Sequence, residues 1–331
     1  MKLPARPLRP LAALGLALGS TVLMSGEARA DCSCREAAVV VMGHRGTGTN
    51  GPANPWPENT LPSFEQGVTE GADWIELDVQ HSADGALVVL HDETVDRTTD
   101  GTGCAGALDL AALAALDAAA GTPLAGTGVT IPTLDEVLAA VDVGVNIEIK
   151  IESGGSCPAS DRSLLAADVV AAIHADAKSR PFLVSSFDAE VLTLVKALDA
   201  SVPVGLLGVD PADLAVATSR GFDALHPFYL AVDATLAADV HAAGLTLNAW
   251  TVDDPASIGK MLGLADGIIS DEPGLVASLR AEACAAECPA PAEETSGCSV
   301  GGRGASGWLA AGLSGLGLAL FAARRARARR P

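Results

Sequence analysis

Basic side chains are scarce in this chain of 331 residues, and so are aromatic ones. There are 21 Lys and Arg against 41 Asp and Glu, which gives a formal net charge of −20 at pH 7. This acidic excess argues against a nucleic-acid partner. It also repels small anions at long range, so a site for an anion must supply its own positive charge. Tyr and Phe number only 1 and 6, but 49% of the residues are hydrophobic, which is enough to bury a core.

The cysteines stand apart from the histidines. The seven are Cys32, Cys34, Cys104, Cys157, Cys284, Cys288 and Cys298. A zinc site at either close pair, residues 32 and 34 or 284 and 288, is not expected because no histidine lies nearby to complete it. In an exported chain these residues instead predict three disulfides and leave Cys298 for processing or lipidation. Six cysteines allow fifteen pairings, so the connectivity stays open.

The first 30 residues have the pattern of a secretory signal peptide. Three basic residues precede an apolar run over residues 11–24, and Ala-Arg-Ala occupies positions 28–30. A basic start, a short apolar segment and small residues before the cleavage position are typical of such peptides. We therefore predict export and cleavage after Ala30. Lipidation at Cys32 is a weaker alternative, since Asp31 is an unfavourable residue in front of a lipidated cysteine.

The C-terminal end divides into a linker (residues 284–306), an apolar segment (307–323) and a basic tail (324–331). The apolar segment is near the lower limit of length for a transmembrane helix, and the arginines after it favour a cytoplasmic position. The pattern resembles the C-terminal sorting signals of myxobacterial surface proteins, from which the tail is removed. A permanent single-pass membrane anchor is the alternative. Either way, we expect the protein at the cell surface or outer envelope.

Residues 38–283, between these ends, alternate short apolar runs with Ala- and Leu-rich amphipathic runs. This alternation predicts repeated βα units around a parallel sheet, and the length suits one α/β domain, a TIM (β/α)8 barrel. The predicted strands are 38–42, 74–79, 146–151, 182–185, 204–207, 224–226, 246–250 and 267–270. The predicted helices are 61–70, 134–140, 163–177, 189–198, 211–218, 235–243, 256–262 and 274–283. An extra strand at 86–91 and an excursion over 98–131 with one short helix complete the prediction.

Three carboxylates fall on two of the predicted strands. Glu76 and Asp78 are two residues apart on one strand, so their side chains point the same way, and Glu148 lies on the next barrel strand. Functional groups of such barrels gather at the C-terminal ends of the strands. Three carboxylates at one mouth would repel one another without a cation. We therefore predict that they bind one hard divalent cation, Mg²⁺ or Ca²⁺.

Short motifs with these and other polar residues follow one another along the chain. They are His44-Arg45-Gly46, Pro57-Glu58-Asn59-Thr60, Glu76-Leu77-Asp78-Val79, His91-Asp92, Arg97-Thr98-Thr99, Glu148-Ile149-Lys150, Trp250-Thr251-Val252 and Ser270-Asp271. In these motifs, over residues 39–279, the chain is similar to the glycerophosphodiester phosphodiesterase family. The resemblance implies a barrel of the phospholipase C-like phosphodiesterase type. It also implies metal-dependent hydrolysis of glycerophosphodiesters to sn-glycerol 3-phosphate and an alcohol.

The resemblance assigns acid and base catalysis to His44 and His91, because histidine titrates near neutral pH and suits both tasks. The sequence does not say which is the acid. Arg45 and Lys150 are expected to bind the phosphate and to stabilise the charge that develops on it. An ion pair of Lys150 with Glu148 or Asp78 is the structural alternative.

Two further residues are expected to support the site. Trp250 would line the glycerol or head-group side of the pocket, with barrel packing as the alternative. Glu58 would orient Arg45 or a histidine, and direct contact with the cation is the alternative. The expected partner is a small glycerophosphodiester, and the sequence predicts no oligomeric state.

Two other functions remain open at this point. A related barrel that cleaves lysophospholipid or sphingolipid head groups, in the manner of a phospholipase D, shares the two histidines and the carboxylates. A non-catalytic surface binding module is disfavoured, because both histidines and all three predicted metal carboxylates are present. Direct attack by water and attack by the glycerol 2-hydroxyl to give a cyclic phosphate are both compatible with the sequence.

Overall fold

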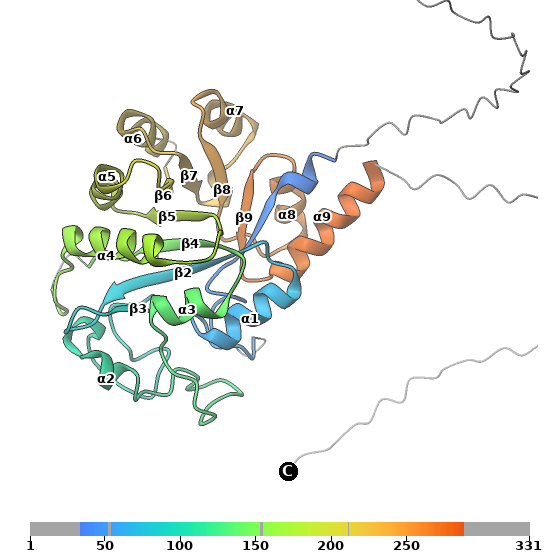
Figure 1. Cartoon of the computed structure of the whole chain (residues 1–331). Coiled ribbons are helices and arrows are strands. Elements are labelled where there is room, and N and C mark those ends of the chain that lie inside the picture. Colours follow the sequence, from blue (N-terminus) through green and yellow to red (C-terminus); the bar gives the residue numbers. More distant parts are fainter. Residues whose placement is uncertain (1–33, 52–53, 153–154, 211, 288–331) are drawn as a thin grey trace, which may run out of the picture. The chain divides into compact units, whose positions relative to one another are not determined.

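Eight parallel strands close into a barrel in the computed structural model, which describes residues 34–51, 54–152, 155–210 and 212–287 (Figure 1). They are β1 (Val40–Gly43), β2 (Trp74–His81), β4 (Gly144–Ile149), β5 (Phe182–Ser186), β6 (Val204–Gly208), β7 (Ala224–Pro227), β8 (Thr246–Ala249) and β9 (Gly267–Ser270). Strand β1 pairs with both β2 and β9, which closes the sheet. The predicted barrel is confirmed, and its strands lie within a few residues of their predicted positions.

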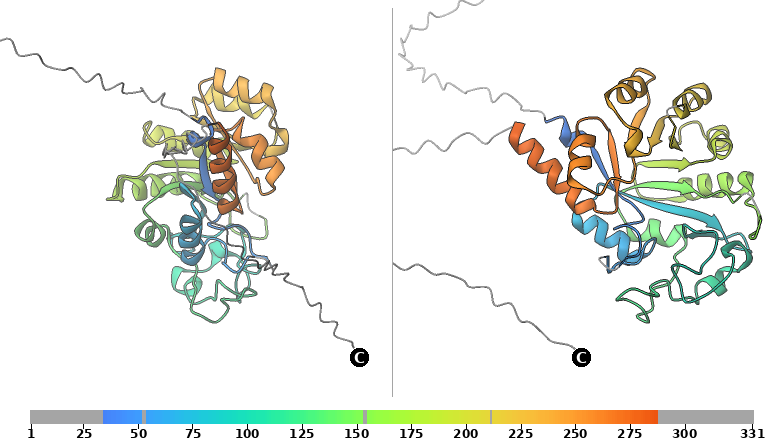
Figure 2. Two further views of the ribbon diagram at one scale, coloured as in Figure 1. Left: turned by 90° about the vertical axis from the view of Figure 1, so that its right-hand side faces the viewer. Right: turned by 180° about the vertical axis from the view of Figure 1, so that it is seen from behind.

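Helices cover the outside of the barrel (Figure 2). They are α1 (Leu61–Glu70), α3 (Leu134–Ala140), α4 (Arg162–Ala175), α5 (Ala189–Leu198), α6 (Asp213–Arg220), α7 (Ala234–Ala242), α8 (Pro255–Leu262) and α9 (Pro273–Glu287). Side chains satisfy the free N–H groups at many of their starts. Thr133 forms a capping box with Glu136, and Asp188 accepts from the first turn of α5.

The barrel strands separate two kinds of surface. Ile75, Leu77 and Val79 of β2 belong to the main hydrophobic core, which is shared with the helices. The alternate residues Glu76 and Asp78 point the other way, into the barrel. This period of two explains why a strand that is buried along most of its length can still present carboxylates to the mouth.

Polar side chains also fill part of the barrel interior. His226 of β7 is fully buried, and its Nε2 lies 2.9 Å from Asn248 Nδ2. Gly205 on the neighbouring strand makes room for this ring, because a Cβ there would lie 2.5 Å from His226 Nε2. Burial lowers the pKa of His226 to about 3, so the ring is neutral. His226 is therefore part of the core of the barrel and does not reach its mouth.

An excursion between β2 and β4 forms a second, smaller core. Strand β3 (Leu87–Val89) lies within the predicted extra strand at 86–91 and pairs antiparallel with β2. The chain then runs through loops and the short helix α2 (Leu110–Leu113). Val95 and Ile131 are buried in this second core. The excursion places residues 91–104 beside the barrel mouth.

Two disulfides fasten the described part of the chain. Cys34–Cys284 joins the segment before β1 to α9, and Cys104–Cys157 joins the excursion to the segment that follows β4. Of the three predicted disulfides, these two are present. The other cysteines, at positions 32, 288 and 298, lie outside the described residues.

The predicted signal peptide (1–30), apolar segment (307–323) and basic tail (324–331) also lie outside the described residues. Helix α9 continues to Glu287, so the first residues of the predicted linker (284–306) are helical. Within the described ranges, no helix is long and apolar enough to cross a membrane.

Candidate active site

Strands β2 and β4 bring the three predicted metal carboxylates together. The register of the pair sets Asp78 beside Glu148. Glu76, Asp78 and Glu148 each offer an oxygen, and these oxygens lie within 4.8 Å of one another. Burial and the charge of Asp78 raise the pKa of Glu76 to about 8. Burial likewise raises the pKa of Glu148. These shifts are the expected consequence of crowding carboxylates at one buried point.

The carboxylate cluster fits a hard divalent cation. Among the described residues, no group donates a hydrogen bond to the buried Oδ1 of Asp78. Lys150 offers some compensation, since its Nζ lies 2.7 Å from Glu148 Oε1 and 3.6 Å from Asp78 Oδ1. The longer distance is too great for a hydrogen bond. The cluster therefore offers three carboxylates, and one of their oxygens, Asp78 Oδ1, accepts no hydrogen bond from the described residues. Carboxylate oxygens are the ligands that Mg²⁺ and Ca²⁺ prefer.

The turn after β1 depends on the backbone conformations of Arg45 and Gly46. Arg45 has a positive φ of 49°, which is uncommon for a residue with a side chain. This conformation lets its backbone N–H donate to Glu76 Oε2 over 2.9 Å. Gly46 follows with φ 96°, and a Cβ there would lie 2.4 Å from Ser63 Oγ. The His-Arg-Gly motif is thus a tight turn that holds Arg45 above the carboxylates.

His44 is paired with a carboxylate from the far end of the chain. Its Nδ1 lies 2.5 Å from Asp271 Oδ1, just after β9. Burial alone would lower the pKa of His44, but the bond to Asp271 and the charge of Glu76 outweigh it, so the pKa is raised. Asp271 itself has a lowered pKa and is ionised, which makes it the acceptor. The Nε2 of His44 is therefore left free for the cavity.

His91 has a similar partner next to it in sequence. Its Nδ1 lies 2.7 Å from Asp92 Oδ1. Here burial prevails and the pKa of His91 is lowered. Asp92 is ionised, since its hydrogen bonds to Arg97 and His91 lower its pKa to about 2 despite partial burial. The two histidines thus share one arrangement but differ in the direction of their pKa shifts.

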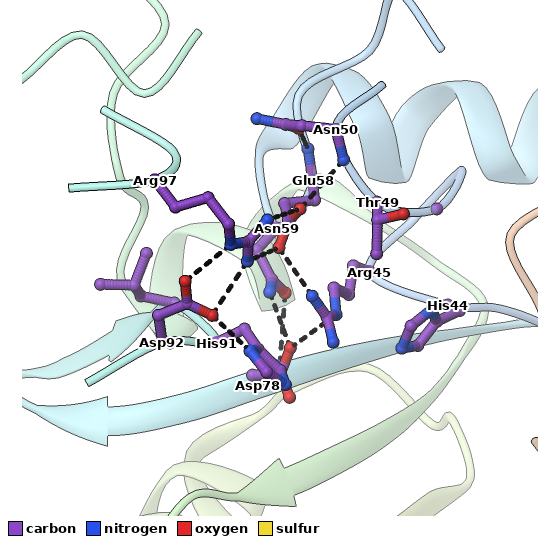
Figure 3. Close-up of polar contacts among 12 residues, drawn as sticks. His44, Arg45, Thr49, Asn50, Glu58, Asn59, Asp78, His91, Asp92 and Arg97 are labelled. Atoms are coloured by element: carbon purple, nitrogen blue, oxygen red, sulfur yellow. Dashed lines mark hydrogen bonds and ion pairs between the residues drawn. The ribbon is translucent and has the colours of Figure 1, made fainter. Parts of the chain in front are cut away.

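The guanidinium of Arg97 connects His91 to the rest of the site through hydrogen bonds (Figure 3). Arg97 donates from Nε and Nη2 to Asp92, over 2.6 and 2.9 Å. It also donates from Nη1 and Nη2 to Glu58, over 2.7 and 2.8 Å. Glu58 in turn accepts from Arg45 Nη1 over 2.8 Å. Arg97 therefore connects His91 to Arg45 through two carboxylates.

Asn59 supports the metal carboxylates from the same motif as Glu58. It has a positive φ of 58°, a conformation that asparagine tolerates better than most residues. Its Nδ2 donates to Asp78 Oδ2 over 2.8 Å. Arg45 Nε lies 3.4 Å from the same oxygen. These contacts and the charge of Lys150 hold the pKa of Asp78 below its usual range, although burial opposes this.

The predicted site residues meet at one cavity with about 440 Å³ of open space. Its ionic wall consists of His44, Arg45, Glu76, His91, Glu148 and Lys150. Its apolar wall consists of Phe187, Leu207, Trp250 and Ile269. Asp78 lies in the carboxylate cluster beneath the cavity, and Glu58 lies behind Arg45. The structure thus places all nine predicted residues in or directly around one site.

Sequence reasoning missed the roles of several residues. Asp271, Asp92 and Arg97 stood in the recognised motifs, but their partners were not predicted. The pairing of Asp92 with His91 could have been suspected from their adjacency. Nothing local indicates the contact of Asp271 with His44, because 227 positions separate them. Phe187 follows a predicted strand end, which was the available signal for a place at the mouth.

Comparison with known proteins agrees with this geometry. Residues 44–275 match the model of the glycerophosphoryl diester phosphodiesterase family. A glycerophosphodiester phosphodiesterase of Caldanaerobacter subterraneus subsp. tengcongensis is 36% identical over 249 residues, which are 72% of this chain and 97% of the relative. One of Bacillus altitudinis is 32% identical over 253 residues, covering 73% of this chain and 98% of the relative.

Solved structures show the same fold. An Oleispira antarctica phosphodiesterase, crystallised in complex with the product sn-glycerol-3-phosphate, superposes with a TM-score of 0.65 at 30% identity, covering 72% of this chain and 96% of that one. A glycerophosphodiester phosphodiesterase of Thermotoga maritima gives 0.57 at 28% identity, covering 72% and 98%. The resemblance seen in the sequence motifs is confirmed. The chain therefore belongs to the glycerophosphoryl diester phosphodiesterase family.

Proposed function

We propose that the protein hydrolyses glycerophosphodiesters to sn-glycerol 3-phosphate and an alcohol, with a divalent cation bound by Glu76, Asp78 and Glu148. The observation that carries the proposal is the carboxylate cluster within 4.8 Å, in a cavity that two histidines and two basic side chains also line. Relatives that the chain covers almost completely bear the name of this activity. Such a cation would act as a Lewis acid toward the phosphoryl group.

His44 and His91 would move the protons. Each histidine donates from Nδ1 to an ionised carboxylate, so each can present Nε2 to a substrate in the cavity. The raised pKa of His44 favours it as the acid that protonates the leaving alkoxide. The lowered pKa of His91 favours it as the base that accepts a proton from the nucleophile. Environments that move two pKa values apart are typical of an acid and base pair.

Arg45 and Lys150 would bind the phosphate and oppose the negative charge that it gathers. Both line the cavity, and nearby carboxylates raise the pKa of each despite burial, so both stay charged. Fixed charges aimed at developing charge are the most effective form of transition-state stabilisation. Trp250 would bound the organic part of the substrate at the apolar wall.

The test is release of glycerol 3-phosphate from sn-glycero-3-phosphocholine by the full chain. The reaction is run after EDTA treatment and after addition of Mg²⁺ or Ca²⁺. We expect activity to be lost with EDTA and restored by one of the ions, which also identifies it. Undiminished activity after removal of all divalent metal would contradict the role given to the carboxylates. His44→Gln and His91→Gln should each lower kcat at least ~100-fold.

We further propose that the protein is exported and held at the cell surface through residues 307–323. The two disulfides support export, because such bonds persist in oxidising compartments. The test is protease treatment of intact cells that express the full chain, followed by detection of the barrel. Protection of the barrel from protease until the cells are lysed would contradict surface exposure. Mass spectrometry of the mature protein then locates both ends.

A further inference from the structure

Two buried polar side chains of the cavity take no part in the reaction proposed above. They are Asn146 of β4 and Ser185 of β5, and both line the cavity. Each residue is only 1% exposed. Among the described residues, no group forms a hydrogen bond with Asn146 Oδ1, Asn146 Nδ2 or Ser185 Oγ. A buried polar group without a partner costs free energy, so such groups beside a ligand cavity indicate a ligand that supplies the partners.

Comparable side chains elsewhere in the barrel do have partners. Asn248 of β8 is also buried, and its Nδ2 donates to His226 Nε2. Ser186 directly follows Ser185 and is equally buried, but its Oγ donates to the carbonyl of Ile149 over 2.8 Å. The fold therefore uses the polar groups of Asn248 and Ser186, whereas it leaves those of Asn146 and Ser185 available.

The strand register places Asn146 and Ser185 next to the carboxylate cluster. Asn146 pairs with Glu76 across β2 and β4, and Ser185 pairs with Glu148 across β4 and β5. Asn146 and Glu148 are two residues apart on one strand, so their side chains share a face and lie about 7 Å apart along it. Because Glu148 is nearer the C-terminal end of β4, Asn146 lies deeper in the barrel. We call Asn146 and Ser185 the polar floor.

The polar floor has no charge and can both donate and accept hydrogen bonds. The amide of Asn146 offers two N–H donors and an acceptor oxygen, and the hydroxyl of Ser185 can do either. An alcohol hydroxyl has the same dual character, so two neighbouring hydroxyls match this pair of side chains. A hydrocarbon chain would leave the polar atoms without partners. Phosphate is better bound by the charged groups of the ionic wall.

We propose that the polar floor binds the two free hydroxyls of the glycerol part of the substrate and thereby selects for glycerol. This inference rests on the proposed function, because the phosphate must occupy the ionic wall for the attached glycerol to reach the floor. The glycerol then points into the barrel, and the second alcohol points toward the mouth. Phe187, which is 52% exposed, borders the cavity on that open side. Asn146 and Ser185 are thus specificity-determining residues for the glycerol, and the head group is free to vary.

The test measures the binding of two phosphates that differ only in their hydroxyls. Calorimetry with the full chain and the metal that restores activity gives Kd for sn-glycerol 3-phosphate and for n-propyl phosphate, which lacks both hydroxyls. We expect the parent protein to bind glycerol 3-phosphate about 30-fold more tightly, as expected for a few buried hydrogen bonds. In Asn146→Leu/Ser185→Ala, which keeps the shape of the floor, this preference should fall below about threefold, and Kd for propyl phosphate should stay within about twofold.

Ser186→Ala is the matched control. It removes a hydroxyl of equal burial from the adjacent position, where the fold already uses it. The preference for glycerol 3-phosphate should be unchanged in this variant. Ser185→Ala alone, the smallest change, should reduce the preference to roughly tenfold. This single variant decides the question if the double variant does not fold.

Three results would overturn the inference. An unchanged preference in the double variant would mean that the hydroxyls are bound elsewhere and that the floor binds only water. Equal weakening of both phosphates would indicate a structural role. A parent protein without any preference would show that the hydroxyls are not recognised. In each case, hydrolysis of sn-glycero-3-phosphocholine by the parent protein would leave the proposed function intact. A parent protein that neither hydrolyses this diester nor binds either phosphate would refute the proposed function itself.

Discussion

The guanidinium of Arg97 is shared by two carboxylates, each of which also contacts a residue of the cavity. It makes bidentate contacts with Asp92 and Glu58, and the Glu58 side chain is only 2% exposed. Planar, paired contacts of this kind fix position as well as charge. Arg97 does not line the cavity in the described structure, so it acts through its partners. It is a positioning residue.

Arg97→Lys should lower kcat/KM for glycerophosphocholine by roughly 10- to 100-fold, because a lysine keeps the charge but cannot hold both carboxylates in plane. The midpoint of thermal unfolding should move by only a few degrees, since much of the Arg97 side chain is exposed. Steady-state kinetics and a thermal melt measure the two effects. Arg220→Lys is the control, because Arg220 pairs with Glu190 away from the cavity. Activity within twofold of the parent would show that Arg97 does not position the site.

Asp271 should matter for the pH dependence of the reaction as well as its rate. Asp271→Asn removes the charge that helps raise the pKa of His44, so that pKa should fall. If His44 is the acid, activity is lost as pH rises through its pKa. The alkaline limb of the kcat profile should therefore move to lower pH, and kcat should drop by at least ~100-fold. Asp199→Asn, which alters a contact with the exposed His174 away from the cavity, is the control. A profile with an unchanged alkaline limb would argue against His44 as the acid.

Among the elements, strand β7 carries a buried histidine, His226, that should make stability depend on pH. The pKa of His226 is about 3 in the folded barrel, because of burial, against 6.5 for the free side chain. The unfolded chain therefore binds a proton more readily. The contribution of the neutral His226 to the free energy of unfolding is complete above pH 6.5 and is lost as pH falls toward 3. One pKa unit corresponds to about 1.4 kcal/mol, so this contribution can reach at most several kcal/mol.

Replacing His226 should weaken the dependence of stability on pH. In His226→Gln the amide can still bond Asn248 but does not titrate in this range. The free energy of unfolding, measured by urea denaturation, should fall less between pH 6.5 and 4.5 in this variant than in the parent protein. His174→Gln, at an exposed position of α4, is the control. Parallel curves for parent and His226→Gln would contradict a neutral, buried His226.

The excursion between β2 and β4 is anchored by a disulfide close to the site. Cys104–Cys157 attaches the end of residues 91–104, the segment with His91, Asp92 and Arg97, to the chain that follows β4. Cys104→Ser/Cys157→Ser should lower kcat/KM by roughly tenfold or more, since slight misplacement of a reacting group is costly. Cys34→Ser/Cys284→Ser, which opens the other disulfide, should affect stability but not kcat/KM. Assays at a temperature where both variants remain folded separate these outcomes. Equal kinetic losses in the two variants would assign both disulfides to stability alone.

The observed elements, set beside the predicted ones, show how much of the fold could be predicted from the sequence. Strands and helices of the barrel were predicted within a few residues, because apolar runs and caps such as Thr133 and Asp188 are local signals. The excursion was predicted only as an extra strand and one short helix. Its core joins Val88 to Ile131, and no periodic pattern in an Ala- and Gly-rich stretch reveals such a contact.

For the site, the metal carboxylates could be predicted because a strand period of two fixes where their side chains point. Both histidines could be predicted because they stand in motifs that resemble those of the family. Their partners could not. The contact of His44 with Asp271 exists only because the barrel closes β1 against β9. The bridge through Arg97 depends on how a loop folds, and residue types alone do not specify that.

The whole molecule has a strongly acidic balance, with a formal net charge of −20 at pH 7. It should repel an anionic diester such as glycerophosphoglycerol more than the zwitterionic glycerophosphocholine. Added salt screens this repulsion, since the Debye length falls to about 10 Å at 0.1 M. We therefore expect kcat/KM for glycerophosphoglycerol to rise several-fold between low salt and 0.2 M NaCl. The value for glycerophosphocholine, measured alongside, should change little. A fall for both substrates would mean that the basic groups of the cavity govern approach.

The mouth of the barrel is divided between two sets of strands. The ionic wall comes from β1, β2, β4 and the excursion, whereas the apolar wall comes from β5, β6, β8 and β9 or the residues just after them. The residues of the ionic wall all precede those of the apolar wall in the sequence. Randomised libraries confined to codons 187, 207 and 250 would therefore leave the proton and metal chemistry untouched. For directed evolution, the preference for the organic part of the substrate can thus be varied separately from the catalytic groups.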